Sequence, residues 1–253
     1  NNAVLVVAGD VSPEDVLRLA KKYYEPLQAK NLPIRKPQIE VNALGIKRIE
    51  VKVPAENPDL TMAWQVPKLN PNKLDVAEPY ALQVLAAILD GHANSRMNRI
   101  LVRDKRIADA VDASYGALGR GPQLFTLGAS ISKKSSPSMV ESEIRNILKD
   151  IAVNGVTDVE LNRVKTQLMA AQVYKKDSVF GQAMEIGVFE MNQISWKYAD
   201  DYVAAIGKVN SSQIKEVINK YLRDDNLTIA FLNPQAMDLK KTTNQSAPLR
   251  LRH

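Results

Sequence analysis

The hydrophobic pattern of the chain begins with a continuous apolar run at residues 3–8. A run of this length is typical of a strand that is buried on both faces. A helical period follows, for which Ser12 is a suitable N-cap, Pro13 fits the first helical position and Pro26 marks the end. The chain is therefore predicted to open with a buried strand and a helix.

The periodic pattern is lost at residues 28–45, where Pro33 and Pro37 interrupt a polar segment. Such a segment is typical of a semi-extended linker, and we expect a domain boundary there. After it, apolar and polar residues alternate through residues 49–53 and again through residues 60–66. This alternation predicts two half-buried strands joined by a turn.

The remaining elements follow from periodicity and from cap residues. Ser136, Thr157 and Asn210 each precede a helical apolar stripe, and Thr157 with Glu160 has the form of a capping box. Two later strands, with a Gly- and Pro-containing turn between them, resemble a hairpin. Beyond the elements named above, the pattern predicts helices at 76–90, 95–105, 136–151, 157–168, 177–191, 196–205 and 210–221, and strands at 110–118, 124–132 and 227–232.

The last predicted strand repeats the pattern of the first. Residues 225–234 and residues 1–10 each contain a polar pair, an apolar run and a turn. The repetition indicates a duplicated architecture, in which residues 1–27 are expected to be the last part of the first copy. The alternative is that any strand followed by a turn would look alike. The predicted parts are residues 1–27, the end of a sister domain (the preceding copy); 28–45, a linker; 46–234, a whole domain; and 235–253, a polar tail.

The composition excludes several classes of protein. A chain of 253 residues that is 45% hydrophobic and 25% charged can bury one sizeable core. It has no apolar run near the roughly 18 residues that a membrane helix needs. Its 34 Lys and Arg against 28 Asp and Glu give a net charge of +6. The basic residues are scattered beside acids, unlike the basic stripe of a nucleic-acid-binding surface.

Cysteine and histidine content limits the chemistry. The chain has no cysteine, which excludes disulfides, thiolate metal sites and cysteine nucleophiles. Neither His92 nor His253 has a second histidine or an acid at helical ligand spacing. A catalytic zinc site therefore cannot be assembled from them, and we expect no cofactor in this chain. The opening residues contain neither Met nor a basic leader, so the sequence is expected to begin within a longer protein.

Three segments carry a resemblance to a known family: the opening run at 2–15, a helix, glycine loop and helix start at 85–97, and the capped helix at 156–165. In this order and spacing they resemble the pitrilysin or insulinase family of zinc peptidases, which includes mitochondrial processing peptidase. The resemblance implies the C-terminal, non-catalytic domain of such a peptidase. The implied fold is α+β: a mainly antiparallel sheet with helices on one face, preceded by the terminal strand and helix of a sister domain.

The resemblance also implies candidate substrate-binding residues. In catalytic relatives this domain supplies an Arg and, seven residues on, a Tyr, which reach the substrate carbonyl. The run 102–110 resembles the family's Arg-Glu-Lys-Arg-Gly-Leu-Ala-Tyr, which places Arg103 at the Arg position but Ala110 at the Tyr position. A methyl group cannot stabilise an oxyanion. Tyr115 is a second candidate if the strand is shifted, and the alternative for Arg103 is a helix-end residue paired with a neighbouring acid.

The implied function is shared between two halves. This half would form one wall of a peptide-sized chamber, while a partner half, in the same polypeptide or in a separate subunit, would hold zinc and hydrolyse the peptide. The expected partners are that zinc-bearing half and peptide substrates, with no nucleic acid and no membrane span. The alternative is a structural or assembly subunit of the same family that has lost proteolysis. A bacterial periplasmic location is expected, with the cytoplasm or the mitochondrial matrix as alternatives.

Overall fold

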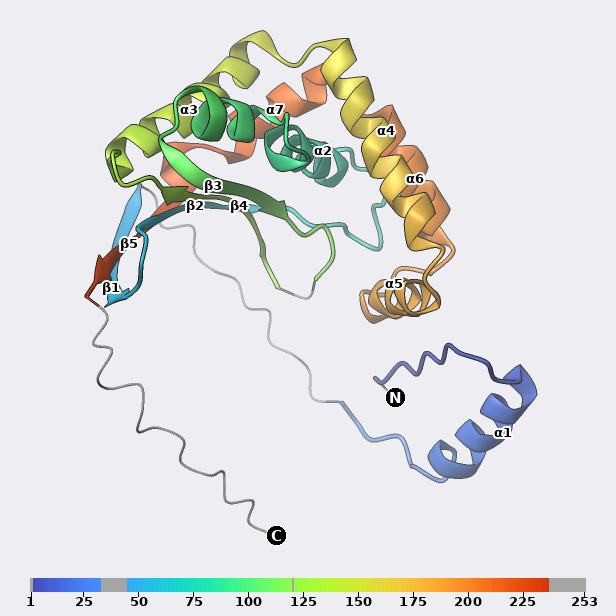
Figure 1. Ribbon diagram of the computed structural model, residues 1–253. Coiled ribbons are helices and arrows are strands. Elements are labelled where there is room, and N and C mark those ends of the chain that lie inside the picture. The colour runs from blue at the N-terminus through green and yellow to red at the C-terminus, as the bar shows by residue number, and fades with distance from the viewer. Residues whose placement is uncertain (1, 33–44, 120, 237–253) are drawn as a thin grey trace.

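The computed structural model describes residues 2–32, 45–119 and 121–236, and within them five strands form one sheet (Figure 1). The strand order is β1-β5-β2-β4-β3. Strands β1 and β5 run parallel, and the other neighbouring pairs are antiparallel, which confirms the predicted mainly antiparallel sheet. The bounds are β1 Lys47–Pro54, β2 Asp59–Val66, β3 Ala108–Tyr115, β4 Gln123–Ile131 and β5 Leu227–Gln235.

The helices that pack on the sheet lie on one of its faces, so the α+β architecture is also confirmed. Figure 1 shows α2, α3 and α7 over the strands, with α4 and α6 beside them. None of the described helices is both long and apolar enough to cross a membrane. The bounds are α1 Pro13–Tyr24, α2 Glu78–Asp90, the π-helix η1 Asn98–Asp104, α3 Pro137–Asn154, α4 Asp158–Lys175, α5 Val179–Met191, α6 Tyr198–Lys208, α7 Ser211–Tyr221 and the short 3-10 turn η2 Asp224–Asn226.

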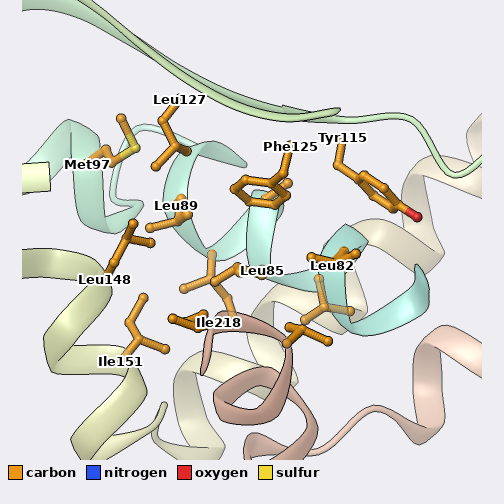
Figure 2. Close-up of a cluster of buried hydrophobic side chains, with 14 of the residues drawn as sticks. Leu82, Leu85, Leu89, Met97, Tyr115, Phe125, Leu127, Leu148, Ile151 and Ile218 are labelled. Carbon is orange, nitrogen blue, oxygen red and sulfur yellow. The ribbon is translucent and has the colours of Figure 1, made fainter. Parts of the chain in front are cut away.

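The core lies between the sheet and α2. Alternate residues of β2 and β4 point toward the helices, and the buried members include Trp64 and Phe125. Three leucines of α2 pack beneath the strands and against residues from α3 and α7 (Figure 2). These leucines are Leu82, Leu85 and Leu89. Strand β2 therefore buries the face that its alternation predicts. Helix α2 is buried on most of its sides, beyond a single apolar stripe.

Strand β1 corrects one expectation. Its alternating pattern predicts a half-buried strand, but all eight of its residues are exposed. It lies at the edge of the sheet, beside β5, and has no neighbouring strand on its other side among the described residues. Alternation identifies the strand correctly, but burial depends on neighbours that the pattern cannot indicate.

The opening segment corrects a second expectation. The predicted helix is present as α1, and the Ser12 hydroxyl accepts a hydrogen bond from the backbone N–H of Asp15. Residues 3–8, however, form no strand and are mostly exposed. A strand needs a partner for its N–H and C=O groups, and no described strand pairs with this segment. Residues 33–44 of the predicted linker and residues 237–253 of the predicted tail lie outside the described residues.

Candidate substrate-binding face

The side of the sheet that faces away from the helices is open. Strand side chains alternate between the two faces, so each strand contributes every second residue to this open face. Strand β1 contributes Ile49, Val51 and Val53. On β2 to β5 most of these residues are small or carry a short polar side chain. They are Thr61 and Ala63 on β2, Thr126, Gly128 and Ser130 on β4, Ala110, Asp112 and Ser114 on β3, and Thr228 and Ala230 on β5. Small side chains leave the sheet surface accessible to an extended polypeptide.

Two carboxylates give this face a negative region. The side chain of Asp112 lies over Gly128 on the neighbouring strand, where a Cβ atom would come within 2.0 Å of its carboxylate oxygen. A larger residue at position 128 would therefore displace the Asp112 carboxylate from this position. Burial raises the pKa of Asp59, and the charge of Asp112 raises this pKa further. The open face thus combines small side chains with a partly desolvated acid.

The outer edge of β3 is partly covered by the end of α2. The Asp90 carboxylate accepts hydrogen bonds from the backbone N–H of Ala113 and from the side chain of Asn98. Burial nevertheless raises the pKa of Asp90. Because a backbone donor of β3 is already satisfied by a side chain, this edge is less available for pairing with an added strand.

Arg103 lies in the last turn of η1, shortly before β3 begins. Its side chain is exposed and forms no hydrogen bond or ion pair with any described residue. The alternative in which Arg103 pairs with Asp104 or Asp109 is therefore not seen among these residues. A guanidinium without a protein partner is free to donate to a carbonyl or carboxylate of a ligand.

Tyr115 lies at the other end of β3 and belongs to the core. Its side chain points toward the helices, stacks on Phe125 and is only 7% exposed (Figure 2). The hydroxyl donates to the backbone carbonyl of Pro67 at 2.7 Å, and burial raises the pKa of the phenol. Eight residues of strand span about 23 Å, so the structure does not bring Arg103 and Tyr115 together.

The histidines offer no metal site within the described residues. His92 lies in the loop after α2, where its Nδ1 accepts a hydrogen bond from the backbone N–H of Asn94 at 2.9 Å. Burial lowers the pKa of His92. Residues 2–32, 45–119 and 121–236 contain no group of three or more His, Cys, Asp or Glu that could hold a metal ion. His253 lies outside these ranges.

Comparison with known proteins gives the family. A sequence profile described as the peptidase M16 inactive domain matches residues 1–168, which is more than half of the chain. The chain belongs to the peptidase M16 inactive-domain family. The predicted resemblance to the non-catalytic domain of pitrilysin-type zinc peptidases is thereby confirmed.

Relatives of this M16 domain include longer proteases. The chain is 25% identical over 241 residues to the zinc protease PqqE of Helicobacter pylori, covering 92% of this chain and 52% of the relative. A protease structure from Helicobacter pylori has a TM-score of 0.80 and 21% identity, covering 90% of this chain and 54% of that one. The periplasmic protease PqqL of Escherichia coli has a TM-score of 0.63 and 14% identity, covering 90% and 25%. The chain thus spans about half the length of PqqE.

The turn before β3 bears on which residue of this M16 domain stands at the expected tyrosine position. Arg106 has a φ of 54°, a left-handed conformation that glycine adopts more readily. Glycine stands fifth in the family run Arg-Glu-Lys-Arg-Gly-Leu-Ala-Tyr. If Arg106 takes the place of that glycine, the run is one residue shorter and Asp109 replaces Ala110 at the tyrosine position. Neither a methyl group nor an ionised carboxylate can donate a hydrogen bond to a substrate carbonyl.

Residues 85–97 and 156–165, two of the segments that carry the M16 resemblance, are in contact through the side chain of Arg96. Its guanidinium donates to both carboxylate oxygens of Glu160, at 2.9 and 2.8 Å, and to Asp150 at 2.8 Å. The predicted capping box is therefore only half formed: the Thr157 hydroxyl accepts from the Glu160 N–H, but the Glu160 carboxylate binds Arg96. Sequence reasoning missed this largely buried pair because its members lie 64 positions apart.

Proposed function

We propose that this M16 domain forms one wall of a peptide-binding chamber in a zinc metallopeptidase, opposite a half that carries the zinc. The observation that carries the proposal is the open sheet face, which is lined by small side chains and left uncovered by α2, α3 and α7. An extended peptide can approach this face closely over the middle of β2, β3 and β4, where the side chains are small. The bulkier Ile49, Val51 and Val53 lie on the same face but at the β1 edge. The similarity to PqqE, which is named as a zinc protease, supports the assignment.

Zinc, in this proposal, is held by the partner half. The described residues do not fit a zinc site, because they contain no suitable group of His, Cys, Asp or Glu. The partner half is joined to this one in the same polypeptide or associates as a separate subunit. That this chain spans about half of PqqE supports a two-half protein. We further propose a periplasmic location, as the description of PqqL states for that protein.

Arg103 is the residue that we propose to contact the peptide. It is exposed and unpaired among the described residues, and it lies next to the strand that carries Ala110 onto the open face. A guanidinium can hold a substrate carbonyl or carboxylate by charge-assisted hydrogen bonds. Tyr115 has no such access, because its hydroxyl is bound to Pro67. We therefore propose that Tyr115 supports stability and does not contact the peptide.

A second candidate function is a structural or assembly subunit without proteolytic activity. The side chains at the two tyrosine positions near the start of β3, Ala110 and Asp109, favour it, because neither can assist at the substrate carbonyl. The two functions differ in their prediction for Arg103. A structural subunit binds no peptide in its chamber, so the loss of the Arg103 side chain would not change the subunit's function.

The test is a set of variants of this domain assayed together with its zinc-bearing half. Arg103→Ala should lower kcat/KM for a fluorogenic peptide by about ten- to a hundred-fold, which corresponds to about 1.5–3 kcal/mol for a hydrogen bond to a charged group. Arg99→Ala, in the same helix and also exposed, is the matched control and should have no effect. Partial recovery in Arg103→Lys would indicate that charge matters more than the planar fork.

The outcomes separate the two functions. If the assembled protein hydrolyses peptides and Arg103→Ala retains wild-type kcat/KM while folded, Arg103 does not contact substrate. If the assembled protein hydrolyses no peptide and binds none, the structural function is favoured. This domain alone is expected to bind no stoichiometric zinc, and elemental analysis near one zinc per chain would contradict the assignment of zinc to the partner half.

A further inference from the structure

We infer that strand β1 pairs antiparallel with β1 of a second copy of this chain, about a two-fold axis through Val51. This inference goes beyond the proposed function, because it concerns the opposite edge of the sheet from Arg103. In the described chain, β1 is paired on one side only, with β5. Its other edge therefore presents backbone donors and acceptors that an added strand can bind.

The apolar side chains of β1 show what such a strand would cover. Ile49, Val51 and Val53 lie on the open face and are 50%, 41% and 36% exposed. They form a row beside Ala230 and Leu232 of β5. Long exposed edge strands with an apolar row are uncommon in monomers, because they associate with other strands. A second β1 placed alongside would extend this row and remove it from water.

The sequence of β1 is self-complementary in one register. When Val51 lies opposite Val51 of the second copy, Ile49 lies opposite Val53, and Glu50 lies opposite Lys52. A two-fold axis repeats each contact, so two Ile–Val pairs and two Glu–Lys pairs form at once. Opposite charges and apolar pairs at facing positions both stabilise antiparallel strands. This register therefore places opposite charges facing each other and apolar side chains facing each other.

Neighbouring registers are less favourable. Centring the pair on Glu50 places Glu50 opposite its own copy and Arg48 opposite Lys52, which repels. Centring it on Lys52 places two lysines face to face. In a register that sets Val51 opposite Glu50 or Lys52 of the second copy, the apolar rows of the two copies would lie on opposite faces of the sheet. Centring on Ile49 keeps one opposite-charge pair, between Arg48 and Glu50, but shortens the pairing and sets Lys47 against Val51.

Strand β1 is also held in place for this pairing. Arg48 forms two hydrogen bonds with Glu141 of α3, at 2.8 and 2.9 Å, and the side chain of Asn233 on β5 donates to Glu50 at 2.8 Å. The edge is therefore formed before a second copy binds, so little ordering is required. Both copies would carry their helices on the same side of a continuous ten-stranded sheet.

The absence of cysteine allows a direct test of the register in the 253-residue chain. In the inferred pairing the two Val51 Cα atoms lie about 4.5–5.5 Å apart, within reach of a disulfide. Val51→Cys should therefore form a covalent dimer on mild oxidation. Ile49→Cys is the matched control on the same strand and face, since its two copies would lie about 13 Å apart and should not be linked. Preferential linkage of Ile49→Cys would overturn the register.

Charge exchange tests the contact without covalent chemistry. Glu50→Lys alone and Lys52→Glu alone each create two like-charge pairs, so each should raise the dimer Kd by about tenfold or more. Mixing the two variants should restore association, because one copy then carries lysine at both positions and the other carries glutamate at both. Within each single variant chain the charges at positions 50 and 52 are still alike, so a rescue on mixing must come from contacts between two chains. Sedimentation velocity over a concentration series measures all of these states.

Three results would overturn the inference. The first is a wild-type chain that stays monomeric at the highest concentration that can be measured. The second is a dimer whose Kd does not respond to either single charge reversal. The third is a mixture that associates no better than its components. Circular dichroism spectra that match the wild type would establish that each variant is folded, which the exposure of β1 leads us to expect.

Discussion

Residues 1–10 and residues 225–234 have the same hydrophobic pattern but opposite surroundings. Strand β5 lies between β1 and β2, with Leu227 and Ile229 buried against the helices. The opening run forms no strand, and Leu5, which corresponds to Ile229 in the repeat, is 57% exposed. An apolar run therefore specifies the capacity to be a central strand, while neighbouring strands decide whether it becomes one.

The helices beside these two segments differ in the same way. Ser12 is the N-cap of α1 and Asn210 is the N-cap of α7, and the side chain of each accepts a hydrogen bond from a backbone N–H. Helix α7 buries Ile214, Val217 and Ile218, whereas α1 buries none of its residues. Local capping is thus sufficient for a helix in both places, but only α7 contributes to the core. This contrast agrees with the prediction that residues 1–27 belong to a sister domain, which stays a prediction.

The largest expected effect compares the two matched strand positions. Ile229→Ala should lower the free energy of unfolding by about 2–5 kcal/mol, because it leaves a cavity in the core. Leu5→Ala should change it by less than about 0.5 kcal/mol, since Leu5 is exposed. Urea denaturation of both variants measures the difference. Equal losses would show that residues 3–8 are packed as tightly as β5.

A second comparison concerns two arginine ion pairs. Arg96 and Glu160 are largely buried, whereas Arg18 and Asp15 of α1 are more than 60% exposed. Arg96→Ala should cost about 3 kcal/mol, because it leaves the Glu160 carboxylate partly buried without its partner. Arg18→Ala should cost less than about 0.5 kcal/mol. Thermal unfolding followed by circular dichroism is suitable for both variants, and a small effect of Arg96→Ala would contradict a stabilising role for this pair.

The third comparison uses the two helix caps. Asn210→Ala removes a complete capping box and should lower the free energy of unfolding by about 1 kcal/mol. Ser12→Ala removes a comparable bond from α1 but should leave the global transition unchanged, because α1 has no buried residues. Amide hydrogen exchange would detect its local effect instead. A global loss in Ser12→Ala would mean that α1 unfolds together with the sheet.

The smallest expected effect depends on pH. Asp59, which pairs with Leu232 of β5, has its pKa raised by burial and by Asp112. A carboxyl whose pKa is higher in the folded state loses stabilisation as pH rises above its unfolded value, near 3.8. Asp59→Asn should therefore raise the melting temperature slightly at pH 7 and have no such effect near pH 3. Asp201→Asn, at an exposed position of α6, is the control and should leave the melting temperature unchanged.

Local signals in the sequence predicted most of the secondary structure. The caps at Ser136, Thr157 and Asn210 locate the starts of α3, α4 and α7, because each side chain bonds to a backbone N–H only three residues away. Alternation likewise identified the buried face of β2. These inferences depend on residues that lie close together in the chain.

Tertiary structure decided the features that depend on distant residues. The sequence alone could not show that β1 is an edge strand, that Glu160 binds Arg96 in place of its own helix cap, or that the Tyr115 hydroxyl is held by Pro67. The partners in the two side-chain contacts lie 64 and 48 positions away. A side chain's availability to a ligand depends on which groups the fold places beside it. That is why the sequence proposed both Arg103 and Tyr115, whereas the structure places Arg103 in η1 before β3 and Tyr115 at the far end of β3.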